Sequence, residues 1–474
     1  MAISRRYFFA LAGASAAGTV LASPLKNLYA RQARGESVRG TGYGALKPDP
    51  NGLLDLPPGF QYRAFSRTGE IMSDGNPVPA DHDGMAAFPG PGRSTILVRN
   101  HELSPDEVKK PQAVASPEQT YDSLCRGGTT TLVVGQNREL LKSFVSLAGT
   151  YRNCAGGPTP WGSWISCEEN TSTPEGNKFI DDPQNANRPI PDPTNVSKRH
   201  GYNFEVPASA EIGVVSPIPL VAMGRFNHEA VAVDPRTGVV YQTEDRADGL
   251  FYRFIPNQRG HLQAGGLLEA LKIKDMPQAI TKTNIPVGKK FEVEWVRIDN
   301  VDPPNDGEPA AGEDVTQYGT RYQGFVKGAA QFTRGEGIAY DNGEFFFNCT
   351  DGGEKELGQV WRYIPDVSQS GGTLELFVEP NDQSALDGPD NIVVSPFGDL
   401  IICEDGEGEQ FVVGVTQDGE LYDLARNALN DSEFAGACFS PDGGTMFVNI
   451  QNPGITFAIW GPWKRSRGMS GKYR

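Results

Sequence analysis

Residues 226–246 read FNHEAVAVDPRTGVVYQTEDR, and the pattern in this stretch decides the fold. A polar cluster precedes an apolar run, a turn containing Pro and Gly follows, and a second apolar run ends in two acids and an arginine. Two apolar runs joined by such a turn predict a β-hairpin. The first strand of a hairpin begins beside the end of the second, so both polar clusters meet at the end away from the turn.

Five further stretches repeat this order with different residues. They are DHDGMAAFPGPGRSTILVRNHE (81–102), RNCAGGPTPWGSWISCEEN (152–170), RGEGIAYDNGEFFFNCTDGG (334–353), LDGPDNIVVSPFGDLIICEDG (386–406) and SEFAGACFSPDGGTMFVNIQNPG (432–454). If the six hairpins are arranged radially, their polar ends converge on one centre. The repeat therefore predicts an all-β fold, a six-bladed β-propeller with loop and short helical insertions. A sandwich or mixed architecture is the alternative, because any antiparallel β protein contains strand–turn–strand runs.

The segments between the hairpins complete the expected organisation. Strand-like residues 130–134, 250–255 and 360–364 would supply outer strands, and residues 267–271 are expected to form a short helix. Residues 171–200 are polar and Pro-rich, which predicts an excursion loop. We expect a signal peptide at 1–30, a lead-in segment at 31–55 that joins the fold loosely, and a single propeller domain at 56–474.

Composition excludes several classes of function. The net charge of −16 argues against nucleic-acid or anionic-membrane partners, which require basic patches. Five histidines are too few for a His-rich zinc or copper centre, whereas the Asp, Glu and Asn residues at the hairpin ends suit calcium. The six cysteines form no CxxC pair, and we expect most of them to be free and buried. Cys154 differs because it lies in a small-residue loop, where a thiolate could bind iron or another transition metal.

The first 30 residues predict export. Arg5-Arg6 precedes a short, weakly apolar stretch that is too short for a membrane span. We therefore expect a twin-arginine signal, recognition by the twin-arginine export machinery, and a periplasmic or extracellular protein without stable membrane insertion. Twin-arginine substrates cross the membrane folded, often with a cofactor already inserted. The mature chain is expected to be a monomer.

Arg334 and Glu336 lie two residues apart between glycines. Alternate residues of a strand face the same way, so both side chains can address one site. Arginine suits bidentate capture of phosphate or carboxylate, and glutamate suits a metal. A surface ion pair is the alternative interpretation. No GxSxG, Walker, GxGxxG or HExxH motif is present, so the usual hydrolase and nucleotide signatures are missing.

Taken together, these motifs resemble a known family. The stretches NCAGGPTPWGSWISCEEN, GRFNHEA, TEDR, RGEGIAY, LDGPDNIVVSPFGDLIICEDG and EFAGACFSPDGGTMFVNIQNPGITFAIWGPW, behind a twin-arginine leader, are similar to the PhoX family of bacterial alkaline phosphatases. The similarity runs from residue 56 to residue 463. It implies a six-bladed propeller with Fe3+ and Ca2+ at its centre.

The resemblance also implies roles for individual residues. Arg334 would be the catalytic, phosphate-holding residue, and Arg246 and Asn153 are further candidates for substrate binding. Cys154 would bind iron, with Cys167 as its main competitor. The expected metal-binding residues are Cys154, Glu229, Glu336, Glu169, Asp387, Asp390, Asn391, Glu404, Glu244 and Glu102. The second acids of TEDR and CEDG, Asp245 and Asp405, are additional candidates, whereas Glu433 is expected to be structural.

The expected function is that of a secreted, metal-dependent phosphomonoesterase that releases inorganic phosphate from organic phosphate esters. Metal ions would clamp the phosphate oxygens and activate the attacking oxygen, while Arg334 stabilises developing charge. One alternative is a calcium-dependent lactonase or esterase on a similar propeller, which would need neither iron nor a cysteine ligand. The other is a non-catalytic binding propeller, in which the acids at the hairpin ends are solvated turns.

Overall fold

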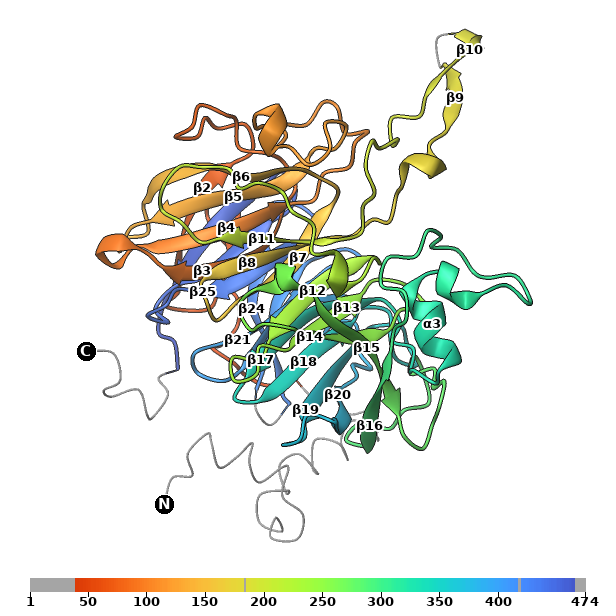
Figure 1. Ribbon diagram of the computed structural model, residues 1–474. Helices are drawn as coiled ribbons and strands as arrows, with labels where there is room; N and C mark the ends of the chain where they lie inside the picture. The colour runs from red at the N-terminus through yellow and green to blue at the C-terminus, as the bar shows by residue number, and fades with distance from the viewer. Residues whose placement is uncertain (1–38, 183–184, 417–418, 465–474) are drawn as a thin grey trace.

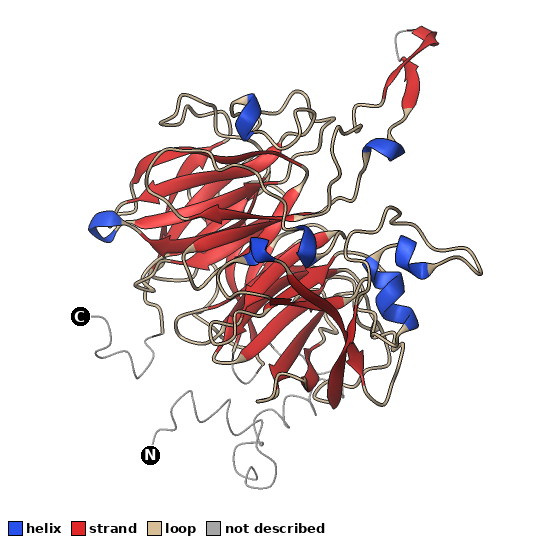
Figure 2. Ribbon diagram, viewed as in Figure 1, coloured by secondary structure: helices blue, strands red, loops and turns tan. Residues whose placement is uncertain are grey.

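The computed structural model describes residues 39–182, 185–416 and 419–464, and these form an all-β, propeller-like fold (Figure 2). The signal peptide and the first part of the lead-in segment lie outside the described residues. The one α-helix of the described ranges is α3 (Thr320–Val326). The short 3-10 helices are η1 (Pro91–Arg93), η2 (Pro117–Gln119), η3 (Pro174–Gly176), η4 (Val221–Met223), η5 (Leu262–Ala264) and η6 (Val315–Gln317).

The strands form antiparallel sheets, most of them built from strands that are neighbours along the chain. The first sheet contains β3 (His82–Pro89), β4 (Thr95–His101), β5 (Gly127–Val134) and β6 (Leu140–Thr150), and the second contains β7 (Asn153–Pro158), β8 (Ser163–Glu168) and β11 (Asn203–Pro207). A nine-stranded sheet contains β12 (His228–Val233), β13 (Val240–Glu244), β14 (Phe251–Pro256), β15 (Gly266–Ile273), β16 (Lys290–Arg297), β20 (Gly371–Val378), β19 (Gln359–Pro365), β18 (Glu344–Cys349) and β17 (Gly335–Asp341), in that spatial order. The next sheet contains β21 (Pro389–Val394), β22 (Leu400–Glu404), β23 (Phe411–Val415), β24 (Leu421–Asn427) and β1 (Leu54–Asp55). The last contains β25 (Phe434–Phe439), β26 (Met446–Ile450), β27 (Ile455–Trp460) and β2 (Gln61–Arg67).

All six predicted hairpins are present, and their first strands pack side by side in a closed ring, in the order β3, β7, β12, β17, β21, β25 and back to β3. The sheets, however, do not divide into six separate blades. Because β16 pairs with β20 from Lys290–Glu375 to Glu294–Gly371, two neighbouring units merge into the nine-stranded sheet. The hydrogen bonding of the strands therefore gives a propeller-like ring whose outer edges are partly joined.

The turn of the hairpin β12–β13 shows why the local sequence folds back. Gly238 adopts a φ of 80°, a left-handed conformation that glycine tolerates without steric cost. Its amide donates to the carbonyl of Asp234 at 2.8 Å, and the amide of Asp234 donates to the carbonyl of Val239 at 2.9 Å. This turn brings the apolar runs of the two strands into register, so that Val231 pairs with Gln242.

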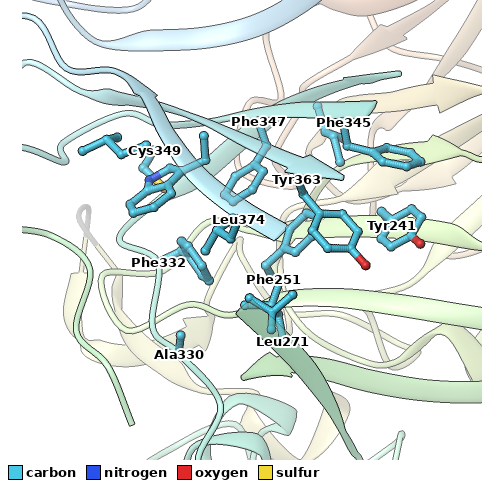
Figure 3. Close-up of a cluster of buried hydrophobic side chains, with 14 of the residues drawn as sticks. Tyr241, Phe251, Leu271, Ala330, Phe332, Phe345, Phe347, Cys349, Tyr363 and Leu374 are labelled. Carbon is cyan, nitrogen blue, oxygen red and sulfur yellow. The ribbon is translucent and has the colours of Figure 1, made fainter. Parts of the chain in front are cut away.

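An aromatic core holds the two halves of the nine-stranded sheet together (Figure 3). Phe251 of β14 stacks on Phe347 of β18 with ring centroids 4.4 Å apart, and Tyr241 of β13 lies 4.2 Å from Phe345 of β18. All four side chains are buried. Truncating such a phenylalanine to alanine typically costs about 3–5 kcal/mol, so this core fixes how neighbouring units sit around the centre.

The two ends of the chain close the ring. β2 pairs with β27, and β1 pairs with β24, so N-terminal residues complete two sheets built from C-terminal strands. The described part of the lead-in segment contacts the fold at a few points and is otherwise largely exposed. Leu54 is 1% exposed, and the ring of Tyr43 lies edge-on to Phe60 at 5.0 Å.

The structure tests several of the local predictions. Residues 130–134, 250–255 and 360–364 fall on β5, β14 and β19, as predicted. The helix predicted at 267–271 is wrong: these residues form β15, because they pair with β14 on one side and β16 on the other. The excursion at 171–200 is confirmed, and it carries the hairpin β9 (Phe179–Asp182) and β10 (Asn185–Pro191), which extends away from the body (Figure 1).

The six cysteines are free and buried, as expected. Within the described ranges, no helix combines the length and the hydrophobicity that crossing a bilayer requires.

Candidate metal and phosphate site

The six hairpins share one backbone device at the ends that face the centre. In β12, His228 pairs with Glu244, and the next pair in register is Val231 with Gln242, so Glu229 lies in a β-bulge. The amide of Asp245 then donates to the carbonyl of Asn227 at 3.2 Å and closes the hairpin. The corresponding bonds run from Glu102 to Asp81, Glu169 to Arg152, Thr350 to Arg334, Asp405 to Gly388 and Gln451 to Glu433, over 2.8–3.2 Å. Each hairpin has a register shift after its first residues.

This device presents polar side chains from three equivalent positions. The bulge residue supplies Asp83, Cys154, Glu229, Glu336 and Asp390 in five hairpins. The residue after the second strand supplies Glu102, Glu169, Asp245 and Asp405, and the residue before the first strand supplies Arg152, Arg334 and Glu433. These twelve side chains line one polar pocket of about 80 Å³. The convergence predicted from the repeat is therefore present.

The pocket carries far more acid than base. Nine carboxylates face two guanidinium groups. Burial raises the pKa of Glu229, Glu336 and Glu433 well above the usual value, and the charges of neighbouring carboxylates raise it further. The same causes raise the pKa of Asp390 to about 8 and that of Asp405 to about 6. Carboxylates packed this closely can all ionise only when cations lie between them.

Two groups of side chains in the pocket have the spacing of a metal site. The ligand atoms of Cys154, Glu169 and Glu229 lie within 4.8 Å of one another, and so do those of Glu229, Glu336 and Asp390. Glu229 belongs to both groups and can therefore bridge two ions. A thiolate among carboxylates suits a transition metal, and the all-oxygen group suits calcium. The donor set thus fits the metals that the resemblance implies.

Cys154 lies in this pocket and Cys167 does not. The sulfur of Cys154 is 3.4 Å from the carbonyl oxygen of His228, and burial beside Glu229 and Glu169 raises the pKa of its thiol well above the usual value. Cys167 is fully buried in β8 among apolar residues. Of the two competitors for iron, only Cys154 faces the carboxylates.

Arg334 is held at the mouth of the pocket. Its Nε donates to Asp245 Oδ1 at 2.9 Å, and its Nη2 reaches Asp245 Oδ2 at 3.1 Å and Glu336 Oε1 at 3.3 Å. Burial opposes its charge, but these carboxylates raise its pKa above the usual value, so the guanidinium stays ionised. Its side chain is 44% exposed. The fork is therefore both oriented and accessible.

Arg152 occupies the equivalent position two hairpins earlier. Its Nη2 donates to Glu102 Oε1 at 2.5 Å and lies 2.8 Å from Glu169 Oε2. The side-chain hydrogen bonds of Arg152 and Arg334 run through Nε and Nη2, so Nη1 is the nitrogen that each can offer to an anion. The two arginines adopt φ values of 47° and 43°, a strained left-handed conformation that is often found at functional sites.

Neighbouring hairpins fix the bulges in place. In four cases a side chain near the end of a second strand donates to the carbonyl of a bulge residue in the next hairpin of the ring. These bonds are Asn100 to Cys154 at 3.0 Å, Thr243 to Glu336 at 2.5 Å, Asn348 to Asp390 at 2.7 Å and Asn449 to Asp83 at 2.7 Å. The bulge residues of the pocket are thus held by strands of the neighbouring hairpins.

Two predicted metal-binding acids lie outside the pocket. Glu244 accepts hydrogen bonds from the amide of Leu250 at 3.1 Å and from the hydroxyl of Tyr252 at 2.7 Å. Glu404 accepts from the amides of Asp387 at 2.9 Å and Phe411 at 3.1 Å. Both acids pair across their hairpins, and side chains alternate along a strand, so the acid that follows each of them faces the centre instead.

Four other candidates also lie outside the pocket. Asp387 accepts from Gln383 Nε2 at 2.7 Å and from the amide of Glu407 at 3.2 Å. Asn391 is an outer partner, because its Nδ2 donates to Asp390 Oδ2 at 3.0 Å. Asn153 is fully buried and donates to Ser166 Oγ at 2.8 Å. Arg246 reaches Asn227 Oδ1 at 3.1 Å and Asp306 Oδ2 at 3.3 Å.

Three residues of the pocket were not anticipated as site residues. Asp83 is the bulge residue of the first hairpin, equivalent to Glu229, and Arg152 is equivalent to Arg334. Glu433, expected to be structural, lines the pocket one residue before β25. Aligning the six hairpins at their bulges would have identified all three, because the positions are equivalent in the backbone.

A second cavity lies on the other side of the bulges. It has a volume of about 380 Å³ and is lined by the residues that follow the bulges, among them Ala155, Val231, Ile338 and Ile392. These side chains are almost all apolar. The polar chemistry is therefore confined to one end of the ring, and an apolar lining lies beneath it.

Comparison with known proteins identifies the family of this chain. The family model described as alkaline phosphatase PhoX matches residues 41–454. Among solved structures, Pseudomonas fluorescens PhoX in complex with vanadate, a transition state analogue, is 18% identical with a TM-score of 0.66, over 90% of this chain and 98% of that chain.

Two other solved structures are more distant. A gluconolactonase from Xanthomonas campestris is 12% identical with a TM-score of 0.36, over 88% of this chain and 98% of that chain. The calcium-binding protein regucalcin from Agrobacterium tumefaciens is 11% identical with a TM-score of 0.38, over 85% of this chain and 96% of that chain. No curated protein matches the sequence significantly. Since the family model spans most of the chain, the protein belongs to the alkaline phosphatase PhoX family and is a phosphatase.

Proposed function

We propose that this phosphatase releases inorganic phosphate from organic phosphate monoesters in the polar pocket, with Fe3+ and Ca2+ bound there. The observation that carries the proposal is the composition of the pocket: nine carboxylates, a buried thiol and two half-exposed guanidinium groups. Phosphoryl transfer requires positioning and charge neutralisation more than a nucleophilic side chain. The absence of a Ser/His hydrolase motif is consistent with that requirement.

Individual residues receive roles from their places in the pocket. Cys154, Glu169 and Glu229 would hold iron, while Glu229, Glu336 and Asp390 would hold calcium. The remaining acids would complete these sites: Asp83, Glu102, Asp245, Asp405 and Glu433. When bound, the metals would supply Lewis-acid charge to the phosphate and lower the pKa of an attacking water.

Two arginines would bind the phosphate itself. Arg334 offers Nη1 while Asp245 fixes its plane, so it can present N–H groups to an equatorial phosphate oxygen. Arg152 is fixed in the same way by Glu102 and Glu169. We propose that these two residues orient the ester, and that Arg246 and Asn153 support the surrounding backbone.

We further propose that the fold is a six-bladed propeller. The closed ring of six first strands and the six equivalent bulges support this assignment, with β16 and β20 joined at the edge of two blades. The single domain would begin at about residue 56, with β1 as an added strand. Arg5-Arg6 and the stretch that follows support twin-arginine export to the periplasm or beyond. We propose that the exported chain is a monomer.

The test of the proposed function is the Arg334→Ala variant, assayed with p-nitrophenyl phosphate and with its metal content measured. We expect kcat/KM to fall by at least about 100-fold, the effect of losing one oriented donor to a transition-state oxyanion, with iron and calcium retained. Arg426→Ala is the matched control, because Arg426 makes a similar two-contact pair with Asp55 outside the pocket. Full activity in Arg334→Ala would refute the phosphate-binding role.

Metal content and activity, measured on the same preparation, distinguish a phosphatase from a lactonase or esterase. A calcium-only site would contain no iron and would be indifferent to Cys154→Ser. Iron bound in proportion to the protein, together with phosphate release, would exclude that alternative.

A further inference from the structure

A histidine lies between two carboxylates behind the wall of the polar pocket. His200, at the end of the 171–200 excursion, places Nδ1 2.8 Å from Glu168 Oε1 and Nε2 3.3 Å from Asp122 Oδ2. The sulfur of Cys125 lies 3.4 Å from the same Nε2. The side chains of the histidine and of both acids are fully buried, and none of them lines the pocket.

Both carboxylates are already surrounded by hydrogen-bond donors. Asp122 accepts from three amides and one hydroxyl, those of Leu124 (2.8 Å), Ser197 (2.6 Å for the amide and 2.7 Å for the hydroxyl) and Lys198 (2.9 Å). Glu168 accepts from three amides, those of Tyr151 (2.9 Å), Gly201 (3.0 Å) and Tyr202 (3.2 Å). Donors of this kind favour the charged form of a carboxylate. Two buried negative charges therefore face the histidine.

The position of the ring between these charges requires the imidazolium form. A neutral imidazole donates from one nitrogen only, so its other nitrogen would point a lone pair at a carboxylate. Burial alone would lower the pKa of His200, but the charge of Glu168 and the hydrogen bonds to Asp122 and Glu168 raise that pKa well above the usual value. The ring therefore donates to both acids and supplies the buried positive charge between them.

Glu168 connects this group to Arg152 through the backbone. Its Oε1 faces His200 and also accepts from the amide of Tyr151, the residue before Arg152. Arg152 has a φ of 47°, a conformation that persists only where the surroundings hold it. One carboxylate oxygen thus contacts the imidazolium and fixes the backbone that leads into the strained arginine.

The fifth hairpin shows the same backbone contact without an arginine. Glu404 lies across its hairpin as Glu168 does, and it accepts from the amide of Asp387, the residue before Gly388. Gly388 has a φ of 57°, which glycine adopts without strain. The equivalent contact in the second hairpin must hold a side chain that binds the substrate, and there the carboxylate has His200 behind it.

We propose that His200 is a positioning residue of the phosphatase: as an imidazolium anchored by Asp122, it holds the carboxylate of Glu168, which in turn keeps Arg152 aimed at the phosphate. This role rests on the phosphate binding proposed above for Arg152. His200 itself contacts neither the substrate nor the metal-binding acids. The end of the 171–200 excursion therefore takes part in substrate binding from behind the pocket.

The test is steady-state kinetics with p-nitrophenyl phosphate on the metal-loaded full chain. We expect His200→Gln to raise KM by roughly 10-fold, the size expected for losing the charged hydrogen bond of Arg152 itself, with iron and calcium content unchanged. Added to Arg152→Ala, the same substitution should leave KM where Arg152→Ala alone puts it, because the residue through which His200 acts is gone. Added to Arg334→Ala, it should still raise KM by roughly 10-fold.

The outcomes separate this role from a structural one and from the proposed function. No rise in KM, a rise of equal size in the Arg152→Ala background, or loss of iron would overturn the role of His200 and leave that of Arg152 intact. If Arg152→Ala itself does not change KM, phosphate binding by Arg152 fails, and the role of His200 fails with it. Glu344→Gln is the matched control, because it breaks a buried ion pair with Arg362 outside the pocket and should leave KM unchanged.

A second variant covers the case in which His200→Gln does not fold. Asp122→Asn keeps the pair of His200 with Glu168 and removes one charged acceptor from the ring. We expect a smaller rise in KM, again only where Arg152 is present. A folded Asp122→Asn protein with the KM of the wild type would overturn the proposal.

Discussion

Two buried groups of charged side chains differ in how their charge is balanced. Within the nine-stranded sheet, Arg362 of β19 lies between two acids, with Nε 2.9 Å from Glu344 Oε2 and Nη1 3.2 Å from Glu375 Oε2. In the central pocket, nine carboxylates share two arginines, both of which are half-exposed at the mouth. In the first group each acid has the guanidinium as a direct partner, whereas in the second most acids have none and need added cations.

The difference separates structural acids from functional acids. Glu344 reaches Arg362 diagonally across the β18–β19 pair, in which Arg362 lies opposite Phe346, so its charge contributes to the sheet. Glu229 and Glu336 are placed beside other acids by the bulges, and their pKa values are raised by burial and by those neighbours. Unbalanced burial of this kind destabilises the protein alone and is retained where a ligand offsets it.

The largest effect is expected from removing Cys154, the one soft ligand of the pocket. We expect Cys154→Ser to lose iron and to lower phosphatase activity by more than about 100-fold, exceeding the 10–100-fold typical of outer-shell changes. Cys167→Ser is the control, since Cys167 is a buried cysteine 13 residues along the chain that does not line the pocket. Iron content and kcat/KM measure the effect. Retention of iron in Cys154→Ser would contradict the assignment.

A smaller effect is expected from the second arginine of the pocket. Arg152→Ala removes one fixed guanidinium but leaves Arg334, so kcat/KM should fall by roughly 10-fold, near the value of one charged hydrogen bond. The fall should appear mainly in KM, and Arg152→Lys should recover part of it. Steady-state kinetics on both variants measure KM and kcat/KM. An unchanged KM in Arg152→Ala would assign Arg152 to holding Glu102 and Glu169 alone.

How much of this could be predicted from the sequence depends on the scale. The six hairpins and the convergence of their polar ends followed from turn residues and apolar runs. The choice between adjacent acids did not: Glu244 and Asp245 are equally polar in the sequence, but strand pairing turns Glu244 into the sheet and Asp245 towards the centre. That choice depends on the exact residue at which a bulge begins.

Asp83 and Glu433 were missed for the same reason. Asp83 and Glu433 look like ordinary polar residues beside a strand, because nothing local in the sequence marks the bulge that exposes them. The joining of β16 to β20 is a long-range pairing between residues about 80 positions apart, and no pattern within either strand specifies its partner.

A still smaller effect is expected from pH on the metal-free protein. Asp390 and Asp405 have pKa values of about 8 and about 6 in the folded state, above the ordinary value of 3.8, so the folded state binds more protons than the unfolded state. The stability that these two groups contribute to the metal-free protein should therefore be largest below about pH 4 and should be lost as the pH rises to about 8.

Metal-loaded protein should show the opposite trend over the same window, because cations displace the protons and bind more tightly as the acids ionise. Unfolding temperatures from pH 4 to pH 8, with and without chelator, measure both trends. Parallel pH curves for the two forms would show that cations do not balance these acids.

The acids of the pocket should oppose folding until cations bind. This is tested most directly by the unfolding temperature of metal-free Glu229→Gln and Glu344→Gln at alkaline pH. We expect Glu229→Gln to raise the unfolding temperature, because it removes one of several like charges, and Glu344→Gln to lower stability by about 3 kcal/mol, because it breaks a buried pair with Arg362. If Glu229→Gln destabilises the metal-free protein as much as Glu344→Gln does, the pocket acids are structural and do not oppose folding in the absence of cations.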